Sequence, residues 1–156
     1  MKCALHIHQK LLDACWNGKT AEAKRLIAEG APVDWQNGIG RAPLHGASVN
    51  GLTEIVMLFL ENKCDVNVTT KKGDTPLICA AENNNMTIAR ELAWSLCDLK
   101  IRNEEGKTAA EEAKERGHKH LAEYLANQAP REQVRLASCA YDAITYSSTR
   151  LFSAWL

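Results

Sequence analysis

Six cysteines are the first candidates for chemistry in this 156-residue sequence, as nucleophiles, metal ligands or disulfide partners. No two of them form the Cys-x-x-Cys pair that is typical of metal and redox sites. The repeating pattern described below accounts for Cys15, Cys64, Cys79 and Cys97 as packing residues. We therefore expect reduced, buried thiols of the kind found in the cytoplasm or the nucleus.

Histidine pairs and glutamate pairs are the remaining candidates: His6 and His8, His118 and His120, Glu104 and Glu105, Glu111 and Glu112. Two histidines do not complete a zinc site, which takes about four ligands. The glutamates fall in a turn and on a charged helix, where a solvated face is the simpler explanation. The sequence also lacks a phosphate-binding Gly-Lys-Ser/Thr, a Gly-x-Ser-x-Gly and a His-Glu-x-x-His. We expect no enzyme activity, no metal site and no cofactor.

The overall charge gives no reason to expect nucleic acid or a membrane as partner. Nineteen Lys and Arg balance nineteen Asp and Glu, and the 46% hydrophobic content is ordinary for a globular protein. No apolar run approaches the ~18 residues that span a bilayer. The N-terminal residues lack the apolar core of a signal peptide. These features favour a cytoplasmic protein, or a nuclear one.

The elements that would position these residues recur every 33 residues. The Gly-Arg-Ala-Pro-Leu of residues 40–44 returns as Gly-Asp-Thr-Pro-Leu at 73–77, and Gly-Lys-Thr-Ala-Ala follows at 106–110. The same spacing relates three further sets: Gly18, Gly51, Asn84 and Gly117; Ala14, Ala47, Ala80 and Ala113; Leu26, Phe59, Leu92 and Leu125. A fixed period of this size predicts a stack of similar structural units.

One full copy, residues 37–69, shows what each unit should contain. Asn37, Gly38 and Gly40 provide a turn. Pro43 suits the first position of a short helix, and Gly51 permits the left-handed backbone that ends it. A second helix follows with apolar residues at helical spacing. Each copy therefore predicts turn, helix, tight turn, helix.

These motifs resemble the ankyrin repeat family, and the resemblance covers residues 9–127. It implies an all-α ankyrin repeat solenoid of stacked helix-turn-helix units with β-hairpin-like loops. We expect a lead-in at 1–8, a partial end repeat at 9–36, full repeats at 37–69 and 70–102, and a charged end repeat at 103–127. An apolar tail occupies residues 128–156.

The chain departs from the family pattern at several positions. The family combines Thr and His in one Thr-Pro-Leu-His motif, whereas here His45 stands with Ala42 and Thr75 stands with Ile78. Each missing hydrogen bond is worth roughly 0.5–1.5 kcal/mol. Lys63 and Leu96 occupy a helix-end position where the family prefers glycine, at a cost of up to ~1–2 kcal/mol each. We expect an array of modest stability.

The resemblance implies binding of a partner protein through the concave face, which the loops and first helices form. The corresponding positions are the loop tips, the residues after the turn glycines and the ends of the first helices. The expected contact residues are Trp16, Trp35, Ile39, Arg41, Val49, Asn50, Lys71, Lys72, Asp74, Glu82 and Asn83. Trp and Arg often dominate interface energies, so Trp16, Trp35 and Arg41 should contribute most. We expect a monomeric, non-enzymatic interaction module or adaptor rather than an oligomer.

Alternatives remain open for Asn67 and for the tail. Asn67 resembles the loop asparagine that an oxygen-dependent hydroxylase modifies in some family members, and it is otherwise a plain turn residue. The apolar residues of 131–156 fit a helix that folds back on the last repeat, a partner-binding or self-associating peptide, or a disordered end. The alternative functions are therefore an assembly protein that associates through its tail, and a subunit that recruits substrates to an enzyme.

Overall fold

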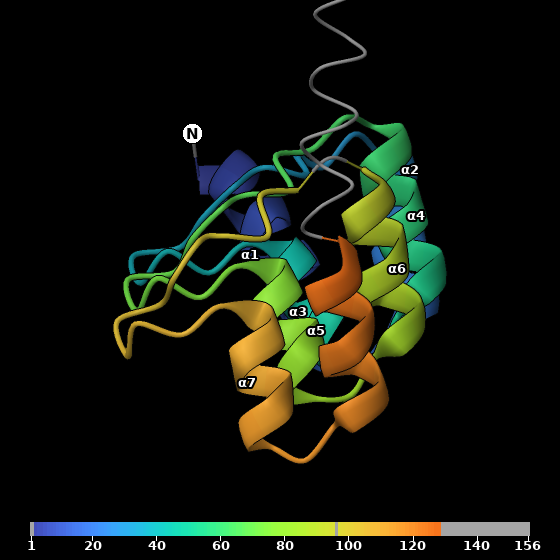
Figure 1. Cartoon of the computed structure of the whole chain (residues 1–156). Coiled ribbons are helices and arrows are strands. Elements are labelled where there is room, and N and C mark those ends of the chain that lie inside the picture. The colour runs from blue at the N-terminus through green and yellow to red at the C-terminus, as the bar shows by residue number, and fades with distance from the viewer. Residues whose placement is uncertain (1, 96, 129–156) are drawn as a thin grey trace, which may run out of the picture.

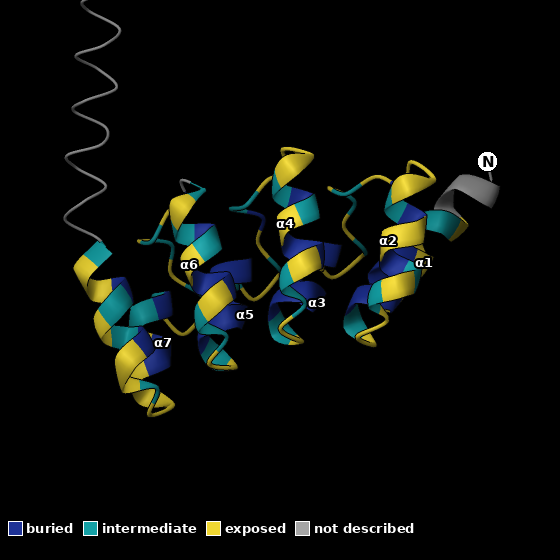
Figure 2. Cartoon of the chain, turned by 90° about the vertical axis from the view of Figure 1, so that its right-hand side faces the viewer, coloured by how far each residue is buried: buried dark blue, intermediate teal, exposed yellow. Residues whose placement is uncertain are grey.

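The computed structural model describes residues 2–95 and 97–128, which form helices and loops without a β-strand. The helices form four successive pairs, and the pairs stack in one row (Figure 2). This arrangement confirms the predicted all-α stack of helix-turn-helix units. The helices are α1 (Lys2–Trp16), α2 (Thr20–Ala28), α3 (Pro43–Val49), α4 (Thr53–Glu61), α5 (Pro76–Glu82), α6 (Met86–Trp94), α7 (Ala109–Glu115) and an eighth at 119–128.

The first and second helices of the pairs lie in separate layers. Helices α1, α3, α5 and α7 contact one another in that order, and α2, α4 and α6 contact one another beside them. Viewed along the row, α2, α4 and α6 lie on one side of the molecule (Figure 1). The connecting loops extend away on the opposite side, beyond the first helices. The loops and the first helices are thus the elements that build a shared surface.

The first helices begin where the sequence predicts. Pro43 and Pro76 each occupy the first turn, where a missing backbone N–H costs nothing. The Thr75 hydroxyl caps α5 by accepting the Ile78 amide at 3.2 Å, and Thr108 caps α7 through the Glu111 amide at 3.4 Å. Proline and a capping hydroxyl therefore fix the direction in which these helices leave the loops.

The ends of the first helices confirm the predicted repeat register. Gly18, Gly51, Asn84 and Gly117 all have positive φ angles, from 56° to 82°. At each of these ends, the alanine four residues before the left-handed residue accepts a backbone hydrogen bond. The donor is the amide of the residue just after the left-handed one, at 2.8–2.9 Å. These carbonyls belong to Ala14, Ala47, Ala80 and Ala113. The residues at this position of the repeat thus play the same structural role in all four copies.

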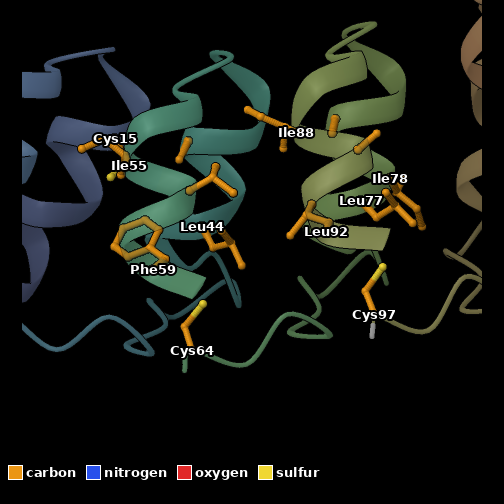
Figure 3. Packing of buried hydrophobic residues seen from close by; sticks show 14 of the residues in the cluster. Cys15, Leu44, Ile55, Phe59, Cys64, Leu77, Ile78, Ile88, Leu92 and Cys97 are labelled. Atoms are coloured by element: carbon orange, nitrogen blue, oxygen red, sulfur yellow. The ribbon is translucent and has the colours of Figure 1, made fainter. Parts of the chain in front are cut away.

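The core lies between the two helix layers and between neighbouring pairs (Figure 3). Leu44, Leu77, Phe59 and Leu92 are at most 2% exposed, as their shared phases predict. The four equivalent alanines of the repeats are equally buried, and their small side chains let adjacent first helices approach closely. Cys15, Cys64, Cys79 and Cys97 are all buried, which confirms the prediction that these four cysteines are packing residues.

The loops before the first helices form tight, hairpin-like turns. In each one, the backbone amide at the turn start donates to a carbonyl four residues later, as in Asn37 N to Arg41 O at 3.0 Å and Thr70 N to Asp74 O at 3.0 Å. Adjacent loops are joined as well, because Lys71 N donates to Ile39 O at 3.1 Å. The loops therefore form one connected layer beside the first helices.

One segment differs from the simplest expectation, and one left-handed residue agrees with it. Helix α1 begins at Lys2, so residues 2–8 are helical rather than a lead-in before the first helix. The reason is packing, since Ile7 contacts the core and the His8 ring lies 5.7 Å from the Trp35 ring. Lys63 has a φ angle of 57°, which confirms the left-handed backbone expected there. Leu96 and the tail from residue 129 lie outside the described residues.

Candidate functional site

A groove of about 500 Å³ lies between the first helices α1, α3 and α5 and the loops before α3 and α5. This volume is in the range of typical ligand-binding clefts. All of the predicted contact residues except Trp35 and Asn50 line it: Trp16, Ile39, Arg41, Val49, Lys71, Lys72, Asp74, Glu82 and Asn83. His45, Thr70 and Cys79 also line it and were not predicted.

One end of the groove is apolar and carries a stacked cation. The Arg41 guanidinium carbon lies 4.5 Å from the centre of the Trp16 ring, a distance at which a cation attracts the ring face. Ile39 also lines the groove, and its large aliphatic side chain is 48% exposed. The position of Trp16 depends on Gly46, because a Cβ atom there would lie 2.9 Å from Trp16 Cδ1 and 3.0 Å from its backbone N.

Side-chain oxygens at the turn starts hold the loop tips in place. Asn37 Oδ1 accepts the amides of Ile39 and Arg41 at 3.1 Å and 3.0 Å. Thr70 Oγ1 accepts the amides of Lys72 and Asp74, both at 3.2 Å. Asn103 does the same in the next loop. These three residues are 33 apart, so the repeat spacing was the signal that would have found Thr70.

His45 forms the floor of the groove and joins two repeats. Its side chain is fully buried, and Nδ1 accepts the Ala42 amide at 3.1 Å. Nε2 therefore carries the proton and donates to the Asp74 carbonyl at 3.0 Å. Burial is the main cause that lowers the pKa of His45, and its bonds to backbone groups oppose that effect. A neutral His45 thus bridges the second and third repeats even though Ala42 replaces threonine.

The charges that line the groove are unevenly paired. Arg41, Lys71 and Lys72 form no ion pair within the described residues, whereas Glu82 lies 2.7 Å from Arg116. Asp74 has long polar contacts with Thr70 and Asn103 and no ion pair there either. Burial raises the pKa of Glu82, and Arg116 lowers it. The exposed loop tips therefore present positive charge to solvent beside the apolar end.

Asn50, Asn85 and His118 bind the ends of the preceding first helices. Asn50 Nδ2 donates to the carbonyls of Cys15 and Trp16 at 3.0 Å and 2.9 Å. Asn85 Nδ2 binds the end of α3, and His118 Nε2 lies 3.2 Å from the Glu82 carbonyl at the end of α5. This bridging explains why Asn50 lies outside the groove. Asn85 and His118 are 33 residues apart, but Asn50 and Asn85 are 35 apart, so the repeat spacing does not reveal the role of Asn50.

Trp35 and Asn67 lie in the loops that connect one repeat to the next. Trp35 is partly buried against His8, which places it at the end of the array instead of in the groove. Asn67 Oδ1 accepts the Asp98 amide of the next repeat at 2.7 Å. Asp34, 33 residues earlier, binds the Asp65 amide in the same way at 2.9 Å. Hydroxylation of Asn67 stays a prediction.

Burial raises the pKa of the Cys15, Cys64 and Cys79 thiols to about 12, which keeps them protonated at neutral pH. No group of three or more His, Cys, Asp or Glu side chains lies close enough to hold a metal within residues 2–95 and 97–128. In the same part of the chain, no helix is both long and apolar enough to cross a membrane.

Comparison with protein families matches residues 11–103 to the family described as Ankyrin repeats (3 copies). The chain belongs to the ankyrin repeat family. The matched residues hold the first three copies of the repeat, and the fourth copy follows with the same helix-end bond, His118 N to Ala113 O at 2.8 Å. Ankyrin repeats typically mediate protein–protein interaction and are generally not enzymes.

Several ankyrin-containing proteins are similar to this chain over part of their length. A putative ankyrin repeat protein of Rickettsia bellii is 37% identical over 81 residues, which is 48% of each chain. Mouse protein phosphatase 1 regulatory subunit 12A is 37% identical over 76 residues, 49% of this chain and 7% of the relative. Human neurogenic locus notch homolog protein 2 is 32% identical over 88 residues, 56% of this chain and 4% of the relative. The chain therefore matches less than half of each relative.

Proposed function

We propose that this ankyrin chain is a non-enzymatic interaction module that binds a partner protein in the groove between its loops and first helices. The observation that carries the proposal is that Trp16, Ile39 and Arg41 line one groove, in which Arg41 stacks on Trp16. Trp and Arg are enriched among the residues that dominate interface energies, and the exposed Ile39 adds apolar contact area to the same groove.

The rigidity of the loops supports the same function. Backbone bonds join adjacent loops, and Asn37 and Thr70 fix the tips, so few residues need to become ordered when a partner binds. A preorganised surface loses less conformational entropy on binding. We also propose that the protein acts as a monomer. We place it in the cytoplasm or the nucleus, where the four buried cysteines of the described residues would stay reduced.

A capture experiment with matched surface variants tests the proposal. Immobilised wild type, Ile39→Glu, Arg41→Glu and Met57→Glu are exposed to an extract of the source cells, and bound proteins are quantified by mass spectrometry. Ile39 and Met57 are almost equally exposed, at 48% and 46%, but Met57 lies on α4 in the other layer. A true partner should be retained by wild type and Met57→Glu and lost from the two groove variants.

Calorimetry with the purified partner then gives the contribution of single residues. Arg41→Ala should weaken binding by about 2 kcal/mol, or roughly thirtyfold, because it removes the cation above Trp16. Its circular dichroism and thermal unfolding should match those of wild type. A partner that binds both groove variants normally but not Met57→Glu places the interface on the second helices and refutes the proposal.

A further inference from the structure

The unpaired charges of the groove indicate which kind of partner segment fits it. Arg41, Lys71 and Lys72 line the groove without an ion pair among the described residues. Asp74 is the lining carboxylate that also has no ion pair there, since Glu82 is paired with Arg116. Three cations therefore face one carboxylate around an apolar end.

The neighbouring acidic surface is paired internally only in part, because two cations, Lys107 and Arg116, contact four carboxylates there: Glu82, Glu105, Glu112 and Glu115. Lys107 lies 2.6 Å from Glu105, and Arg116 lies 2.7 Å from Glu82 and 2.9 Å from Glu112. The lysines at the loop tips have no such internal partner, and both are exposed.

We propose that the groove selects an extended, acidic segment of its partner that carries one aromatic or large aliphatic anchor residue. The anchor contacts Trp16 and Ile39, and carboxylates of the partner pair with Arg41, Lys71 and Lys72. This inference rests on the proposed function, because it names the partner chemistry for the same groove. Neighbouring first helices are about 8–10 Å apart, a distance that three residues of an extended chain span.

Electrostatics at these exposed loop tips should act mainly on specificity and on association rate. Each exposed ion pair contributes little by itself, and about 0.1 M salt screens charges beyond about 10 Å. When a basic segment replaces an acidic one, attraction becomes repulsion at several positions, and the small energies of the single ion pairs add up. The preference for acidic over basic segments should therefore be measurable at low salt and nearly absent at high salt.

Three fluorescein-labelled peptides provide the test. Each has a central Phe in a Gly/Ser background, with two Glu, two Gln or two Lys on either side of it. Fluorescence anisotropy gives the Kd of each peptide for wild type, for the double variant Lys71→Glu/Lys72→Glu, for the control Lys114→Glu/Lys119→Glu, and for Ile39→Glu. Each double variant replaces two lysines by glutamate, so both change the net charge equally. The two control lysines are exposed but lie outside the groove.

At ~50 mM salt, wild type should bind the Glu peptide about tenfold or more tightly than the Lys peptide, with the Gln peptide between them. Lys71→Glu/Lys72→Glu should reverse this order, and the lysine control should keep it. Ile39→Glu should weaken all three peptides. At ~500 mM salt the three Kd values should come within about twofold of one another.

Other outcomes overturn the inference without deciding the proposed function. Equal or tighter binding of the Lys peptide by wild type refutes an acidic partner, and so does a preference that survives Lys71→Glu/Lys72→Glu. If none of the three peptides binds, the acidic segment is refuted as well. In each case the capture experiment with the Ile39 and Arg41 variants still shows separately whether a partner uses the groove.

Discussion

Replacing His45 by leucine removes both hydrogen bonds through which this side chain joins the second and third repeats. The Ala42 amide and the Asp74 carbonyl each lose their imidazole partner, and His45 itself is 0% exposed. A buried polar group without a partner costs about 1–3 kcal/mol, so two such groups should lower the free energy of unfolding by about 2–4 kcal/mol after apolar compensation. That is a large share of the ~5–15 kcal/mol of a typical domain.

The stability that His45 provides should also depend on pH. Burial lowers its pKa in the folded state, while the unfolded chain has the ordinary pKa of about 6.5. As pH falls below about 6.5, the unfolded state takes up a proton that the folded state does not, so stability decreases by up to about 1.4 kcal/mol per pH unit until the folded pKa is reached. Well above pH ~6.5, His45 is neutral in both states and adds no pH dependence to the free energy of unfolding.

Urea unfolding followed by circular dichroism measures both effects. Wild type, His45→Leu and His45→Gln are compared at about pH 7.5 and about pH 5.5, and His120→Gln, at an exposed position, is the control. Wild type should lose about 1 kcal/mol more than His45→Gln between these pH values. Equal pH dependence of the two proteins, or a cost below about 1 kcal/mol for His45→Leu at the higher pH, refutes the bridging role.

Three further predictions concern stability. Leu77 is 2% exposed, so Leu77→Ala should cost ~2–5 kcal/mol in urea unfolding, more than Leu60→Ala at a partly buried position of α4; an unchanged midpoint would contradict the register. Lys63→Gly should stabilise the protein by about 1 kcal/mol, because it relieves a left-handed lysine, whereas Lys63→Ala should not. Gly46→Ala should cost about 1–3 kcal/mol and alter the tryptophan fluorescence, since its Cβ would overlap Trp16 and the backbone of α1; wild-type values for both would show that α1 packs differently.

The sequence by itself determined the repeat register and most of the fold. Proline, threonine, glycine and alanine act through rules that operate within a few residues, so their 33-residue spacing predicts where helices begin, end and pack. The left-handed Lys63 and Asn84 show how strong this register is, because both adopt the backbone of the glycine that stands in other copies. The resemblance also placed most of the groove residues, since loop tips and helix ends converge in any such stack.

The tertiary structure decided which side chains reach across from one repeat to another. Asn50 binds the end of α1, and Trp35 packs against His8 because α1 extends back to Lys2. His45 reaches the Asp74 carbonyl although its own copy lacks threonine. Such contacts depend on the distance and direction between two units, and the sequence of either unit alone contains neither quantity. Which groove charges remain unpaired depends on the same geometry.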